Sequence, residues 1–148
     1  MFGRFLAASP LVILAACQGT PQQPAVTVTD LVVTVPAVPG GPGAGYFTLR
    51  GAGGGGTLLA VASPRAERIE LHETRSEGGM TRMVAIERVA VVDDEVRFEP
   101  GGKHAMLFGV DPALKVGDRL NLTFTFEGAP AVTVEADVRG PGQAHANH

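Results

Sequence analysis

The chain of 148 residues has little cysteine, few aromatic residues and no cluster of positive charge. A single cysteine cannot form a disulfide within the chain. There is no tryptophan and one tyrosine, and the twelve Lys and Arg residues are scattered singly in a chain of net charge −3. Without a basic run or stripe, we expect no nucleic-acid partner. No Ser/His/Asp order and no pair of carboxylates stands out as catalytic, so we do not expect an enzyme.

The chain also lacks any stretch with a convincing helical period. Instead, 20 glycines and 11 prolines separate short apolar runs, which is typical of an all-β protein. Alternation is clearest where Leu122, Phe124 and Phe126 share one face of their run. The expected strands are residues 26–35, 45–50, 56–63, 67–74, 80–88, 95–99, 103–108, 119–126 and 131–138. They predict a β-sandwich of about seven to nine antiparallel strands.

The N-terminal apolar run is too short for a transmembrane helix, which needs about 20 apolar residues. The segment MFGRFLAASPLVILAAC has one arginine, a short apolar stretch and small residues before Cys17, and its end resembles the lipobox of bacterial lipoproteins. By this resemblance the signal is cut before Cys17, which then carries lipid on the periplasmic side of the envelope. Gln18 favours the outer membrane where the host has one. An ordinary secretory signal, releasing the protein to the periplasm, is the alternative.

These features divide the chain into four parts. Residues 1–16 are expected to be the signal peptide, and residues 17–25 the lipidated cysteine with a polar tether. Residues 26–139 are expected to form the β-sandwich, and residues 140–148 a flexible tail that contains histidine. We expect a monomer attached to the membrane through its lipid.

Soft metal-binding side chains are concentrated in one part of the chain. Apart from the initiator, all the methionines (Met80, Met83 and Met106) lie between His72 and Met106, and His104 lies there too. The period of two puts His104 and Met106 on the same side of a strand. Met83 falls opposite the aliphatic residues of its own run, so it does not pack in a core.

Imidazole and thioether together form a soft donor set. Thioether sulfur binds Cu(I) well and binds Zn²⁺, Mg²⁺ or Ca²⁺ poorly. A site without thiolate suits a carrier that must give its metal away, and it excludes a blue-copper centre, which needs cysteine. Methionines that merely fill space and histidines that merely lie at the surface remain an alternative. The protein would then be a lipid-anchored β-sandwich interaction module with no metal role.

The spacing of these residues resembles that of the periplasmic copper chaperone family PCuAC. In that family a His is followed after ten residues by a Met, and after about twenty-one more by His-x-Met. Here ten residues separate His72 from Met83, and twenty separate Met83 from His104. The flanks SPRAERIELHET and PGGKHAMLFG and the early segment GAGYFTLRG are also similar, so the resemblance covers residues 26–139.

The resemblance implies a cupredoxin-like Greek-key β-sandwich that binds Cu(I). It implies delivery of copper to a copper-accepting protein, such as a cytochrome oxidase subunit with its CuA centre or another copper chaperone. The ligands that it implies are His72, Met83, His104 and Met106. Met80 departs from the family spacing and is a candidate auxiliary contact. His145 and His148 resemble the tails that bind Cu(II) in some relatives.

Overall fold

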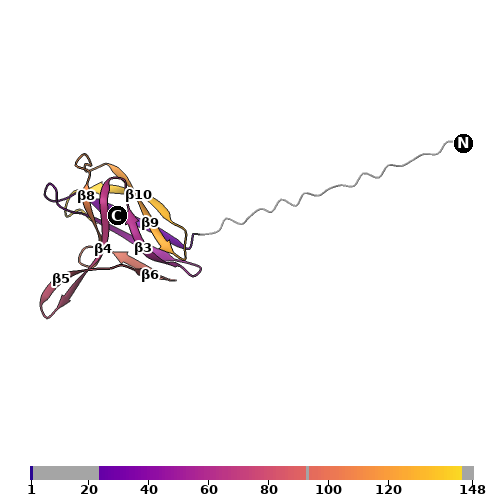
Figure 1. Cartoon of the computed structure of the whole chain (residues 1–148), viewed down its shortest axis with the longest axis horizontal. Coiled ribbons are helices and arrows are strands. Elements are labelled where there is room, and N and C mark those ends of the chain that lie inside the picture. The colour runs from indigo at the N-terminus through magenta and orange to yellow at the C-terminus, as the bar shows by residue number, and fades with distance from the viewer. Residues whose placement is uncertain (2–23, 93, 145–148) are drawn as a thin grey trace.

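The computed structural model describes residues 1, 24–92 and 94–144, and these residues form strands and no helix. None of them therefore forms a helix long and apolar enough to cross a membrane. The strands are β1 (Val26–Thr34), β2 (Gly43–Gly51), β3 (Gly56–Ala62), β4 (Ala66–Glu77), β5 (Met80–Ala85), β6 (Val89–Val91), β7 (Glu95–Phe98), β8 (Lys103–Val110), β9 (Arg119–Glu127) and β10 (Val132–Arg139). Figure 1 shows how they are arranged.

The predicted all-β fold class is confirmed, with ten strands in one mixed sheet. Their hydrogen-bonding order is β5-β4-β8-β7-β2-β1-β10-β9-β3-β6, and β8 also pairs with β2. Most pairings are antiparallel, but β1 pairs with β10 and β7 with β8 in the parallel sense. The sheet therefore departs from the purely antiparallel arrangement that the sequence predicted.

The additional strand, β6, lies directly after residues 80–88, which the sequence predicted as one strand. β5 ends at Ala85, and the backbone amide of Ile86 still donates to Leu71 of β4, with an N···O distance of 2.8 Å. The chain then leaves β4, and Val89 and Val91 are buried in β6, which pairs with β3 at the other end of the sheet order. Residues 80–91 thus contribute the strand at each edge of the sheet, β5 at one edge and β6 at the other.

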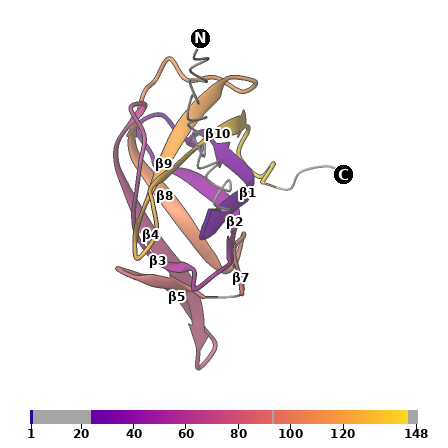
Figure 2. The ribbon, with the colours of Figure 1, turned by 90° about the vertical axis from the view of Figure 1, so that its right-hand side faces the viewer.

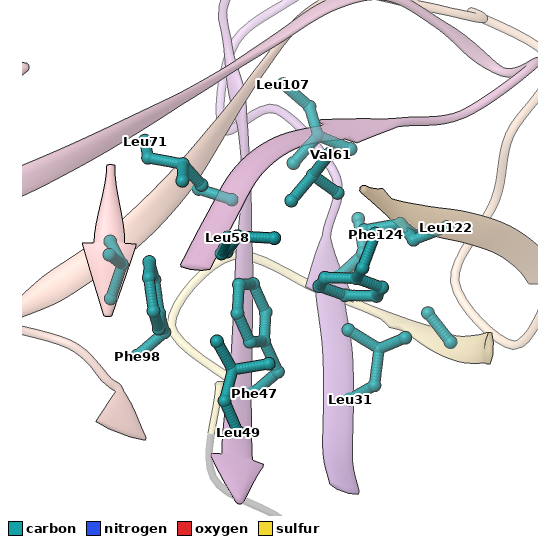
Figure 3. Close-up of a cluster of buried hydrophobic side chains, with 14 of the residues drawn as sticks. Leu31, Phe47, Leu49, Leu58, Val61, Leu71, Phe98, Leu107, Leu122 and Phe124 are labelled. Carbon is teal, nitrogen blue, oxygen red and sulfur yellow. The ribbon is translucent and has the colours of Figure 1, made fainter. Parts of the chain in front are cut away.

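The core lies inside the curve of this sheet (Figure 3). Phe47 of β2 stacks on Phe98 of β7 with 4.3 Å between ring centroids, and meets Phe124 of β9 edge to face at 4.9 Å. Because β1 and β10 separate β2 from β9 in the strand order, this contact requires the sheet to fold over on itself. Leu58 and Leu122 are also fully buried.

The β4–β5 hairpin projects beyond the rest of the sandwich, as Figures 1 and 2 both show. It turns at Gly78 and Gly79, whose φ angles of 59° and 78° are in the region that favours glycine. In β5, Val84 alone is partly buried and every other side chain is exposed. The hairpin therefore carries its side chains outside the core, beside β8.

Candidate metal centre

Three cross-strand pairs of β4 and β8 lie in a row on one face. Arg68 is opposite Phe108, Glu70 is opposite Met106, and His72 is opposite His104. The residues between them point to the other face, where Leu71 and Ala105 are buried in the core. His72, His104 and Met106 thus share the face that points away from the core, which we call the donor face.

Register also places Met83 on the donor face. Met83 is opposite Thr74 of β4, and Thr74 lies two residues after His72 on the same side of the strand. Met80 is opposite Glu77. Glu77 is an odd number of residues from His72 along β4, so Glu77 and Met80 point to the other face. The structure therefore places the four predicted ligands on one face of three adjacent strands and leaves Met80 outside the set. Met83 is 57% exposed.

His104 is the buried histidine of the pair. It is 7% exposed, and its Nδ1 lies 3.0 Å from the carbonyl oxygen of Gly102. A carbonyl only accepts, so Nδ1 donates this hydrogen bond and the lone pair of the neutral ring is on Nε2.

His72 is held differently. Its ring centroid lies 6.0 Å from that of His104, with 24° between the ring planes. Its Nε2 is 3.1 Å from Oε2 of Glu70, whereas its Nδ1 is buried and has no hydrogen-bond partner. A buried polar atom without a partner costs about 1–3 kcal/mol, and such atoms are rare. A metal ion bound to Nδ1 would remove that cost.

Two residues that the sequence analysis did not name support His72. Nε of Arg68 donates to Oε1 of Glu70 over 2.6 Å, and the guanidinium carbon of Arg68 lies 4.4 Å from the ring centroid of Phe108. The hydrogen bonds from His72 and then Arg68 lower the pKa of Glu70 below its ordinary value. The alternation R-x-E-x-H in the sequence, which puts all three on one strand face, is the signal that could have indicated them.

The remaining predicted positions lie outside the described residues. They are Cys17, His145 and His148. Within residues 24–92 and 94–144, no group of three or more His, Cys, Asp or Glu side chains is arranged to hold a metal ion. The candidate donor set here consists of two imidazoles and two thioethers.

Comparison with solved structures identifies the fold. The copper-bound PCuAC domain from PmoF2 superposes with a TM-score of 0.66, at 19% identity over 79% of this chain and 94% of that domain. The solution structure of CuI-DR1885 from Deinococcus radiodurans has a TM-score of 0.57, at 29% identity over 88% of this chain and 87% of that protein. The chain has the PCuAC fold, which confirms the resemblance seen in the sequence.

The chain belongs to the family described as "Putative lipoprotein LpqE-like", and the match covers residues 26–138. One relative, "Putative lipoprotein Lxx21020" of Leifsonia xyli subsp. xyli, is 26% identical over 140 residues, or 93% of this chain and 84% of that protein. "Uncharacterized protein RP573" of Rickettsia prowazekii is 30% identical over 72 residues, which are 47% of this chain and 40% of that protein. The latter match thus spans less than half the length of the relative. The family is one of lipoproteins, a class anchored to membranes outside the cytoplasm.

Proposed function

We propose that this protein is an extracytoplasmic carrier that binds one Cu(I) ion and passes it to a copper-accepting protein. The ligands are His72, Met83, His104 and Met106. The observation that carries the proposal is their register, which aligns the two imidazoles on one cross-strand pair and puts both thioethers on the same face. The copper-bound relatives of the same fold support it.

The chemistry of the donor face suits transport. Two imidazoles at this separation can share one ion, because a metal–nitrogen bond is about 2 Å long. Thioether sulfur adds selectivity for Cu(I), and without a thiolate the metal can leave by ligand exchange. Met83 is exposed on the projecting hairpin, so it is the ligand that a donor atom from the acceptor protein replaces first.

A copper titration tests the proposal. Under anaerobic conditions, Cu(I) is divided between the protein and a chromogenic chelator, and we expect one equivalent to bind. The double variant His104→Ala/Met106→Ala should lose this binding, whereas Met80→Ala should keep it. If the double variant holds copper as tightly as the parent, these residues are not the ligands. If the parent binds no copper at all, an interaction module without a metal role becomes the better description.

The carrier acts at the membrane surface in this proposal, anchored through lipid on Cys17 and delivering copper to the CuA centre of cytochrome oxidase rather than catalysing a reaction. The oxidase activity of a deletion strain, with and without added copper, tests this destination.

We expect the oxidase activity of the deletion strain to fall at low copper and to recover when copper is added. Complementation with the double variant should fail. Complementation with Cys17→Ala then shows whether the anchor is needed. Oxidase activity unchanged by the deletion at low copper would rule out this destination.

A further inference from the structure

The two histidines of the donor face present different ring nitrogens. His104 donates from Nδ1 to the carbonyl of Gly102, which leaves Nε2 free. His72 is engaged at the opposite nitrogen, since Nε2 contacts the carboxylate of Glu70. A glutamate is a carboxylate at neutral pH and only accepts, so Nε2 of His72 carries the proton and Nδ1 carries the lone pair. That lone pair is on the buried atom without a partner.

Glu70 is itself held in place from its other side. Its two carboxylate oxygens are used separately, Oε2 by His72 and Oε1 by Arg68. The guanidinium of Arg68 in turn lies over the ring of Phe108, the residue directly across the ladder. Such cation–π contacts and charge-assisted hydrogen bonds restrict long side chains to one geometry. A chain of contacts thus runs from Phe108 through Arg68 and Glu70 to His72.

We propose that Glu70 is a positioning residue for copper: held by Arg68, it fixes the His72 ring so that Nδ1 binds Cu(I), while His104 binds through Nε2. This inference rests on the proposed function. A carboxylate that accepts from the second nitrogen of a metal-bound histidine fixes its ring orientation and makes it a better donor. The buried Nδ1 then gains the partner that it otherwise lacks.

Nitrogen NMR of the histidine rings tests the assignment directly. In the metal-free protein at neutral pH, we expect His72 to be protonated at Nε2 and His104 at Nδ1. On adding one equivalent of Cu(I), the resonance of His72 Nδ1 and that of His104 Nε2 should shift, while both N–H groups remain. A shift at Nε2 of His72 would mean that copper displaces Glu70, which overturns the inference.

Affinities of matched variants give a second measurement. Glu70→Ala should weaken Cu(I) binding roughly tenfold to a hundredfold, the usual effect of losing such a partner. Glu70→Gln, whose amide oxygen still accepts, should recover most of the loss. Glu73→Ala is the control, because Glu73 also accepts from an arginine two residues away on β4 but points to the other face. Its affinity should equal that of the parent.

The outcomes separate the two proposals. If the parent itself takes up no Cu(I), the proposed function fails. If the parent binds copper and Glu70→Ala binds it equally well or more tightly, the function stands and the positioning role is wrong. An equal loss in Glu70→Ala and Glu73→Ala would mean that β4 is simply destabilised, and it would also exclude the positioning role.

Discussion

At the scale of single residues, the methionine pair of β5 shows how a strand sorts similar side chains. Met80 and Met83 are both exposed, at 68% and 57%, and lie three positions apart. Because successive side chains alternate, this odd offset sends them to opposite faces. Exposure therefore does not distinguish them, and register does.

Replacing each methionine in turn tests this difference. We expect Met83→Ala to weaken Cu(I) binding by roughly tenfold or more, since losing a direct ligand costs at least as much as losing a supporting one. Met80→Ala should leave the affinity unchanged. Competition with a Cu(I) chelator measures both. Equal losses would place Met80 within reach of the ion and contradict the register.

Glu73 provides a pH-dependent test of the ladder between β4 and β8. Hydrogen bonds from Lys103 and then Arg75 lower the pKa of Glu73 from its ordinary value of 4.5. A lowered carboxyl pKa stabilises the fold above the unfolded-state pKa, and this stability is lost as the pH falls through the folded-state pKa. Glu73→Gln should therefore be less stable than the parent at pH 7, and the two should converge in acid below pH 4.5. Urea unfolding at several pH values measures the difference in stability between the two proteins. A difference that persists in acid would mean that it does not come from the charge of Glu73.

Part of the site could be predicted from single residues. The i, i+2 spacing of His104 and Met106 requires only that the segment be a strand. The alignment of His72 with His104 could not be derived from periodicity, because register depends on which strands pair and where, and the resemblance to a known spacing supplied it. The role of Glu70 could not be predicted, because alternating Arg and Glu residues are common on exposed strand surfaces. Its contact with His72 depends on the side-chain rotamers, which the sequence does not give.

At the scale of elements, the end of the β4–β5 hairpin has little contact with the core. Beyond His72, the pairing of β4 with β8 ends at Glu73 and Lys103, and the amide of Thr74 still donates to the carbonyl of Gly102. Further along, β5 is the strand that pairs with β4. Few buried contacts hold this hairpin, and such segments open most easily. A ligand that joins Met83 to the histidines would tie the hairpin to β8.

Hydrogen exchange measures this effect. We expect the amides of β5 to exchange quickly in the metal-free protein and more slowly when Cu(I) is bound, because the metal links β5 to β8. The amides of β9 in the core exchange through global unfolding, so they are the internal reference and report only the overall gain in stability. The His104→Ala/Met106→Ala double variant should show no protection. Protection equal in β5 and β9 would indicate a global rather than a local effect.

Most strands could be predicted, because alternation and glycine-rich breaks mark them well. β6 could not, since three residues carry too little pattern to be separated from the run before them. Tertiary packing ends β5. The chain leaves β4 because burying Val89 and Val91 in β6, against β3, stabilises the fold more than continued pairing with β4 would.

At the scale of the whole molecule, the core and the donor face lie back to back on β4 and β8. Leu71 and Ala105 fill the core from the same strands that carry His72 and His104 on the outside. In the proposed function, copper binding is therefore coupled to folding, because the donors are assembled only when these strands are packed.

This coupling predicts a copper-dependent stability. A ligand that binds only the folded state stabilises it by about 2.7 kcal/mol at a free concentration of about one hundred times its dissociation constant. We expect the melting temperature of the parent to rise by several degrees with Cu(I) under anaerobic conditions, and that of the double variant to stay constant. Zn²⁺ should have little effect on either protein, since thioether sulfur binds it poorly. Equal shifts in parent and double variant would indicate binding elsewhere.

The pairing of β4 with β8 also has a consequence for how the donors come together during folding. β5, β6 and β7 lie between these strands in the sequence, so His72 and His104 meet only after a long loop has closed. Long-range pairings of this kind form slowly, because loop entropy is lost before the contact stabilises anything. If the proposed function holds, a newly made chain has no copper site while it is unfolded, and its capacity for metal begins with one step of folding, the docking of β8 on β4.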